Sequence, residues 1–154
     1  MAQDGVIILV VDDDAGHAEL VRRNLRRGGI ENRLEAICSG AEALDYVHRQ
    51  GKHSTRCSAD GLLLLLDINM PGQIDGIEVL RRIKSNPTTR HIPVIMLTTA
   101  DDPREVERCY DLGCNVYITK PIDPIEFSQA IHQLGLILSV ARLPGDPATR
   151  RSLE

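Results

Sequence analysis

The amino-acid sequence predicts an α/β fold in which a doubly wound parallel sheet of five strands is covered by five helices. Two observations support this prediction. The central apolar run, Leu62–Leu66, is five leucines long, which is typical of a strand that helices bury on both faces. Apolar runs alternate strictly with helix-start signals, and such βα alternation indicates a parallel sheet with helices on both faces. The expected strands span residues 6–11, 32–38, 62–66, 93–97 and 115–119.

Each expected helix begins at an N-cap residue. Asp14 opens the first helix, which we expect to end at Gly28-Gly29. In the other four helices, Glu follows the cap residue by three positions, as it does in a capping box. The pairs are Ser39 with Glu42, Asp75 with Glu78, Asp102 with Glu105, and Asp123 with Glu126. Pro103 and Pro124 stand at the first helical position of the last two helices, where proline is favoured.

Length and composition restrict the function. A chain of 154 residues is expected to form one domain, with a core at about residues 5–142 and a short tail at 143–154. The polar stretch 51–60 has no periodicity and predicts a loop. The net charge of −4 and the aromatic content of 3% argue against a nucleic-acid partner. No stretch is long enough to span a membrane and no signal sequence is visible, so we expect a cytoplasmic protein.

The cysteines form no CxxC pair; they are Cys38, Cys57, Cys109 and Cys114. In a reducing compartment they are most simply interpreted as buried or idle thiols. A metal site at His48, His53 and Cys57 is a competing interpretation, but the sequence suggests no fourth ligand for it.

Polar side chains stand where the apolar runs end. Asp12-Asp13-Asp14 follow the first run, Asp67 the third, Thr98-Thr99 the fourth and Thr119-Lys120 the fifth. Because the carboxyl ends of adjacent parallel strands meet at one edge of a sheet, we expect these groups to converge there. Carboxylates held this close together need a cation, and oxygen ligands favour Mg²⁺. We expect Asp13 and Asp67 to bind it directly and Asp12 to act through water; the simpler alternative is an acidic turn without an ion.

Five motifs, taken in order, resemble those of receiver domains in two-component response regulators. They are Val10–Asp13, Asp67–Pro71, Asp75-Gly76, Thr98 and Tyr117–Pro121. The resemblance covers roughly residues 5–142 and implies the flavodoxin-like strand order 2-1-3-4-5. Leu97–Thr99, Cys114–Pro121 and the lack of an output domain are similar to the single-domain regulators that partner phytochrome-type histidine kinases.

The resemblance implies a role for each strand-end residue. Asp67 is the phosphoacceptor, since a carboxylate can attack phosphorus, and Lys120 and the Thr98 hydroxyl contact the phosphoryl oxygens. The backbone carbonyl of Asn69 is a third ligand of Mg²⁺. Tyr117 resembles the aromatic residue whose rotamer reports phosphorylation; otherwise it is a half-buried strand residue. The implied partner is a sensor histidine kinase, including the phytochrome type, or a histidine phosphotransfer protein.

Two other function classes fit parts of the sequence. A binding-only pseudo-receiver would usually have lost Asp67, Lys120 or an acid of the Asp12-Asp13 pair, and all are present. A dehalogenase-like phosphohydrolase also uses Asp and Mg²⁺, but Asp67-Ile68-Asn69 offers no second Asp as acid–base. The sequence contains neither a P-loop nor a GxGxxG motif, so we do not expect nucleotide binding. We therefore expect a stand-alone response regulator that accepts a phosphoryl group on Asp67 and is not an enzyme beyond slow self-catalysed phosphorylation and dephosphorylation.

The C-terminal helix predicts a homodimer. One helical face should meet the sheet and carries Phe127, Ala130, Ile131, Leu134, Ile137, Leu138 and Ala141. The opposite face carries Ile125, Leu136, Val140 and Leu143, a second apolar stripe that a monomer core cannot use. Two-fold symmetry would bury this stripe twice, although scattered exposed leucines are a simpler interpretation.

Overall fold

The computed structural model describes residues 6–27, 29–55, 61–70, 72–99, 102–119, 125, 126 and 129. The strands are β1 (Val6–Val11), β2 (Leu34–Ile37), β3 (Gly61–Leu66), β4 (Val94–Thr98) and β5 (Val116–Thr119). The helices are α1 (Ala15–Arg27), α2 (Gly40–His48), α3 (Gly76–Ser85) and α4 (Pro103–Leu112), with a 3₁₀ turn, η1, at Gly51–His53. Of the expected fifth helix the structure describes residues 125, 126 and 129, and these are helical.

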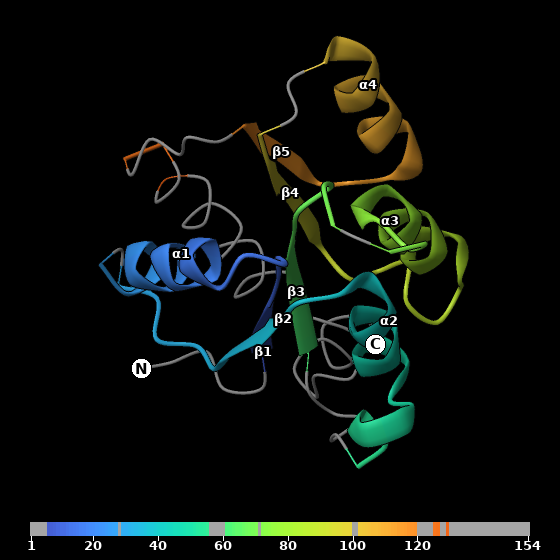
Figure 1. Ribbon diagram of the computed structural model, residues 1–154, viewed down its shortest axis with the longest axis horizontal. Helices are drawn as coiled ribbons and strands as arrows, with labels where there is room; N and C mark the ends of the chain where they lie inside the picture. Colours follow the sequence, from blue (N-terminus) through green and yellow to red (C-terminus); the bar gives the residue numbers. More distant parts are fainter. Residues whose placement is uncertain are drawn as a thin grey trace, which may run out of the picture.

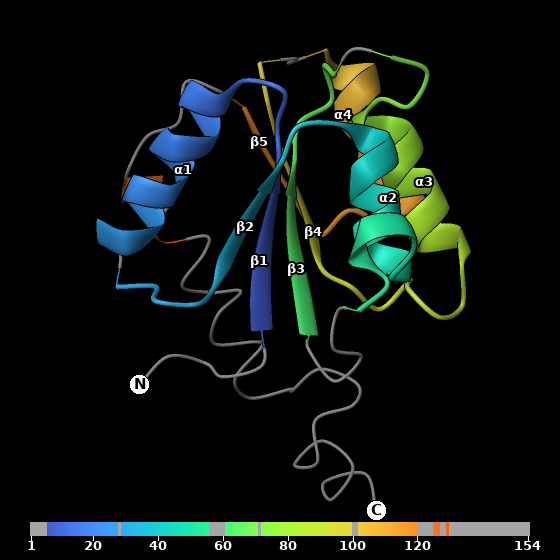
Figure 2. The ribbon, with the colours of Figure 1, turned by 60° about the horizontal axis from the view of Figure 1, so that its bottom comes forward.

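The sheet has the predicted topology. All neighbouring strands are parallel, and their order is β2-β1-β3-β4-β5. Helix α1 covers one face of this sheet, and α2, α3 and α4 cover the other (Figures 1 and 2). The doubly wound, flavodoxin-like fold is therefore confirmed.

The leucine run of β3 divides its side chains between two cores. Leu62, Leu64 and Leu66 belong to the cluster that also contains the buried residues of α2 and α3. Leu63 and Leu65 belong to the cluster under α1. Alternate residues of a strand point to opposite faces, so a strand covered on both sides needs apolar residues throughout. The first polar residue therefore comes where the strand ends, at Asp67.

Four of the five predicted caps lie within the described residues and are present, with one difference, whereas Asp123 lies outside those residues. Asp14 Oδ1 accepts hydrogen bonds from the N–H groups of Gly16 and His17 at 2.8 and 3.2 Å, and Gly29 (φ 84°) ends α1. Ser39 and Asp75 accept from the N–H groups three residues later, at 3.2 and 2.9 Å. Asp102 instead accepts from Arg104 at 2.9 Å, since a cap carboxylate can serve the second as well as the third helical amide.

The prediction of a loop over residues 51–60 is wrong at its start, where η1 forms one turn. Arg49 (φ 55°) and Gly51 (φ 57°) reverse the chain after α2. Glu42 on α2 then pairs with Lys52 at 2.6 Å and with His53 at 3.2 Å. A three-residue turn is too short to produce a periodic pattern in the sequence, so the sequence did not predict it. The contacts from Glu42 stabilise it.

Some predictions fall outside the described residues. Cys57, Lys120, Leu136, Val140, Leu143 and the tail at 143–154 belong to this group. Ile125, the first residue of the proposed dimer stripe, is described and is 70% exposed. None of the helices within the described ranges combines the length and the apolar character that crossing a bilayer requires.

Candidate functional site

The carboxyl ends of β1 and β3 lie side by side and carry the acidic residues. The register pairs Val11 with Leu66, so the next residues, Asp12 and Asp67, are neighbours. Backbone bonds hold both in place: the N–H of Asp12 donates to Ile37 at 3.0 Å, and the N–H of Asp67 donates to Val11 at 3.0 Å. The two carboxylates are thus positioned by the central strands of the sheet.

Three carboxylates converge at this edge. One oxygen each of Asp12, Asp13 and Asp67 lies within 4.8 Å of the others. Asp12 and Asp67 are only 6% and 8% exposed, whereas Asp13 is exposed. The N–H of Asp14 donates to Asp12 at 2.9 Å and the N–H of Asn69 to Asp67 at 3.2 Å, so backbone amides orient both buried carboxylates.

The donor set fits a hard divalent cation. Three carboxylates this close repel one another unless a cation is shared among them, and oxygen donors are the ligands that Mg²⁺ prefers. Mg–O bonds are about 2.1 Å long, so directly bound oxygens lie at most about twice that distance apart. The three carboxylate oxygens lie within 4.8 Å of one another, which is close enough for one ion to be shared among them. Within the described part of the chain, no His or Cys joins a group with metal-ligand spacing.

Two glycines let the β3–α3 loop pass close to its neighbours. A Cβ on Gly76 would lie 2.0 Å from the carbonyl oxygen of Asp67. A Cβ on Gly40, at the start of α2, would lie 2.4 Å from the carbonyl oxygen of Ile74. The N–H of Gly76 also donates to Ile68 at 3.0 Å. The loop that carries Asp67 and Asn69 is therefore held between the first turns of α2 and α3. Sequence reasoning used Gly76 as a motif residue and missed Gly40.

Thr98 and Tyr117 lie on the adjacent strands β4 and β5. Thr98 ends β4, is fully buried, and is paired in register with Thr119. Tyr117 is paired with Met96, is partly buried, and packs against the core on the α2–α4 side. Asn69 is exposed in the loop after β3. The role of Lys120 stays a prediction, since it lies outside the described residues.

His17 stands at the rim of the acidic cluster. Its Nδ1 lies 3.9 Å from Asp12, and its Nε2 lies 3.8 Å from Asp14. Sequence reasoning did not select His17. Its place three residues after the Asp14 cap, in the first turn of α1, was the available signal.

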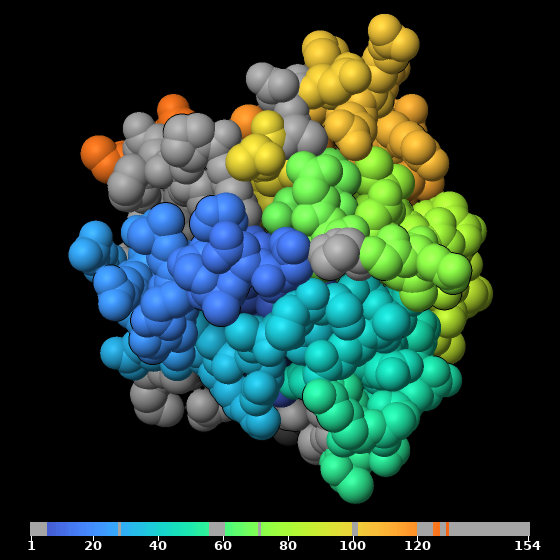
Figure 3. All heavy atoms as spheres, in the orientation of Figure 1, coloured from blue at the N-terminus to red at the C-terminus, as the bar shows by residue number. Residues whose placement is uncertain are grey.

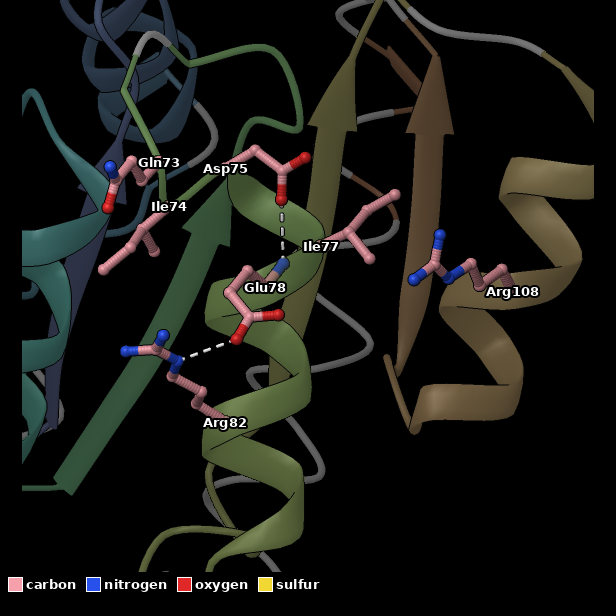
Figure 4. A pocket seen from close by; sticks show the side chains of 7 residues that line it. All are labelled: Gln73, Ile74, Asp75, Ile77, Glu78, Arg82 and Arg108. Atoms are coloured by element: carbon pink, nitrogen blue, oxygen red, sulfur yellow. Dashed lines mark hydrogen bonds and ion pairs between the residues drawn. The ribbon is translucent and has the colours of Figure 1, made fainter.

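A separate groove of about 400 Å³ lies between α3 and α4 (Figure 4). Its lining residues are Gln73, Ile74, Asp75, Ile77, Glu78, Arg82 and Arg108. Glu78 contacts both Arg81 and Arg82, and these guanidinium groups lower the pKa of its carboxyl to about 2. On the face shown in Figure 3, the start of α1 (blue) adjoins the β3–α3 loop (green) and the start of α2 (cyan).

Comparison with known proteins gives consistent matches. A family profile described as "Response regulator receiver domain" matches residues 8–132. Response regulator Rcp1 from Synechocystis sp. is 37% identical over 114 residues, which are 74% of this chain and 76% of Rcp1. The Mn(2+)-bound form of Rcp1 superposes with a TM-score of 0.69 at 32% identity, covering 87% of this chain and 92% of that one.

Two further solved structures are similar. A response regulator receiver domain from Rhodospirillum rubrum is 47% identical with a TM-score of 0.72, covering 90% of this chain and 97% of its own. The bacteriophytochrome response regulator RtBRR is 35% identical with a TM-score of 0.76, covering 96% of this chain and 90% of its own.

Proposed function

This chain belongs to the response regulator receiver domain family, and on that premise we propose that Asp67 is the residue that accepts the phosphoryl group. Receiver domains of this family partner with histidine kinases. The observation that carries the assignment is the position of Asp67. It directly follows the central strand β3, its backbone amide donates to the carbonyl of Val11, and Asp12 and Asp13 each have an oxygen within 4.8 Å of one of its own. Asp12 and Asp13 follow a different strand, β1.

The proposed step is a phosphoryl transfer between two nucleophiles. One Asp67 carboxylate oxygen bonds to phosphorus while the bond from phosphorus to the kinase histidine nitrogen breaks. The electron pair of the broken bond stays on that nitrogen. The N–H of Asn69, 3.2 Å from Asp67 Oδ1, orients the attacking carboxylate. The Thr98 hydroxyl and the Lys120 ammonium stabilise the charge on the phosphoryl oxygens, which is the main source of catalysis in such transfers.

The metal in this proposal is Mg²⁺, which supplies positive charge beside the phosphoryl oxygens when it is bound. Asp13, Asp67 and the carbonyl of Asn69 would hold it directly, and Asp12 would act through water. The convergence of three carboxylates supports this set. The Mn(2+)-bound form of Rcp1 shows that a related receiver binds a divalent ion.

Regulation in this proposal runs from Asp67 to Thr98 and Tyr117. A phosphoryl group on Asp67 would draw the Thr98 hydroxyl toward it, and the ring of Tyr117 would follow. Support comes from the register, because Thr98 and Tyr117 occupy the hydrogen-bonded strands β4 and β5. Thr98 is fully buried and Tyr117 packs against the core. In a close-packed interior, movement of the Thr98 side chain therefore requires movement of the Tyr117 side chain.

The proposed partner is a phytochrome-type sensor histidine kinase or a histidine phosphotransfer protein. The similarity to the bacteriophytochrome response regulator RtBRR favours the phytochrome type. The proposal also includes a single receiver domain over about residues 5–142, a cytoplasmic location, and no enzymatic activity beyond turnover of its own phosphoryl group.

We further propose a homodimer through the C-terminal helix, with Ile125, Leu136, Val140 and Leu143 in the interface. The 70% exposure of Ile125 supports an apolar surface at the start of this stripe. Light scattering tests it: wild type should be a dimer at tens of micromolar, and Leu136→Glu with Val140→Glu should be a monomer. A monomeric wild type would contradict the dimer.

The phosphoacceptor is tested by intact-mass measurement. Wild type incubated with acetyl phosphate and Mg²⁺ should gain the mass of one phosphoryl group, and chelating the metal should prevent it. Asp67→Asn should gain nothing, while the control Asp111→Asn, an exposed acid on α4, should react like wild type. Equal labelling of Asp67→Asn and wild type would overturn the assignment.

A further inference from the structure

Helix α4 is the least anchored of the four helices that the structure describes in full. Of its ten residues, only Cys109 is buried. By the same measure α1 buries four residues, and α2 and α3 bury five each. Leu112 adds a partly buried contact with the same core. Elements with few buried contacts are those that move at low free-energy cost.

A side-chain hydrogen bond joins α4 to the sheet. The hydroxyl oxygen of Tyr110 on α4 accepts a hydrogen bond from the backbone N–H of Tyr117 on β5, at 3.1 Å. Strand β5 stands at the end of the sheet, so Tyr110 occupies a backbone donor of an edge strand. Tyr110 is itself 48% exposed. Packing alone therefore does not fix this side chain, and the hydroxyl contact contributes to its position.

The opposite side of α4 has free space. The groove of about 400 Å³ between α3 and α4 has Arg108 of α4 on one wall and Glu78 and Arg82 of α3 on the other (Figure 4). A shift of α4 toward α3 would fill part of this groove, and Cys109 is the one buried residue of α4 that would have to move within the core. The same shift would carry Tyr110 away from β5.

Strand β5, which donates the hydrogen bond to Tyr110, is paired with β4, whose last residue is Thr98. In the β4–β5 ladder Thr98 is paired with Thr119, and Met96 with Tyr117. A displacement of Thr98 toward Asp67 therefore acts on Thr119 of β5. Thr119 lies two residues from Tyr117, whose N–H donates to the Tyr110 hydroxyl.

We propose that the bond from the Tyr117 N–H to the Tyr110 hydroxyl is a latch that holds α4 in its unphosphorylated position and opens when Asp67 is phosphorylated. This inference rests on the proposed function, because the opening signal is the phosphoryl group. Coupling between two sites is reciprocal: a latch that opposes activation lowers the affinity for an activating ligand by the same factor. One hydrogen bond contributes a factor of about 2 to 12.

The first measurement is amide hydrogen exchange at Tyr117 in the protein without phosphoryl donor. Tyr110→Phe removes only the hydroxyl and keeps the ring, and it should speed exchange of this amide about 2- to 12-fold. Tyr46→Phe, a buried tyrosine on α2, is the matched control and should leave the Tyr117 amide unchanged. Equal exchange of that amide in wild type and Tyr110→Phe would show that no latch exists.

The second measurement is the affinity for beryllium fluoride with Mg²⁺, a non-covalent mimic of the phosphoryl group. Tyr110→Phe should bind it about 2- to 12-fold more tightly than wild type, and Tyr46→Phe should bind it like wild type. Equal affinities for wild type and Tyr110→Phe would overturn the latch while the phosphoacceptor stands. No binding by wild type and no phosphorylation of Asp67 would overturn the proposed function and, with it, the latch as a switch.

Discussion

Substitution of Asp13 by Asn should stabilise the metal-free protein. The change removes one of three carboxylates whose oxygens lie within 4.8 Å of one another. Asp13 is exposed, and Asn keeps the shape and size of its side chain. The substitution therefore acts mainly on charge repulsion.

The magnitude follows from the distance. At 4.8 Å, the upper limit of the separations in the cluster, two unit charges repel by about 0.9 kcal/mol in water and by about 3.5 kcal/mol at an effective dielectric constant of 20. Asp12 and Asp13 are neighbours in the unfolded chain too, so folding adds mainly the Asp13–Asp67 pair. Because Asp13 is exposed and water screens its charge, we expect the free energy of unfolding to rise by about 1 kcal/mol without metal. For a chain of this size, each kcal/mol raises the melting temperature by about 2 to 4 °C.

Urea denaturation with a chelator and with excess Mg²⁺ measures both parts of this expectation. Mg²⁺ should stabilise wild type more than Asp13→Asn, since the variant has lost a ligand. The difference in the free energy of unfolding between Asp13→Asn and wild type should therefore become smaller or change sign when Mg²⁺ is added. The control Glu31→Gln removes one charge from an exposed loop acid away from the cluster. It should neither stabilise the metal-free protein nor reduce the stabilisation by Mg²⁺. A metal-free Asp13→Asn protein that is no more stable than wild type would refute the reasoning.

Three further outcomes are expected. Asp75→Ala should lower the free energy of unfolding by about 1 kcal/mol, because it removes the cap on the N–H of Glu78, whereas Asp75→Ser should keep most of it; equal losses in urea denaturation would contradict this. Burial raises the pKa of the Cys109 and Cys114 thiols from 9.0 to about 11. Unfolding then releases protons between these values, so stability should fall as the pH rises from about 9 to 11, and a double Cys→Ala variant should show a flatter profile. Thr98→Ala should accept a phosphoryl group from acetyl phosphate yet show no change in amide exchange over residues 102–119, and a response equal to that of wild type would exclude Thr98 as the switch.

The strands, the helix caps and the convergence of the carboxylates could be predicted because they depend on local sequence patterns. The leucine run of β3 must be buried on both faces, so its first carboxylate, Asp67, had to stand at the sheet edge. Asp75 was recognisable as a cap from the Glu three residues later.

Other features depend on contacts between distant segments. The need for Gly40 arises from the carbonyl of Ile74, 34 positions further along the chain, and no local pattern encodes that approach. The turn η1 forms because Glu42 reaches Lys52 and His53. The contact between Tyr110 and Tyr117 requires the path of the chain around the end of α4, which Gly113 (φ 106°) sets.

Chemical mapping of the phosphorylated residue tests the central claim most directly. Borohydride reduces an aspartyl phosphate to homoserine, which marks the labelled position for peptide mass analysis. After reaction with acetyl phosphate and Mg²⁺, homoserine should appear at position 67, and Asp12 and Asp13 should remain unchanged. Homoserine at position 12 or 13, with Asp67 intact, would contradict the assignment of Asp67 as the phosphoacceptor.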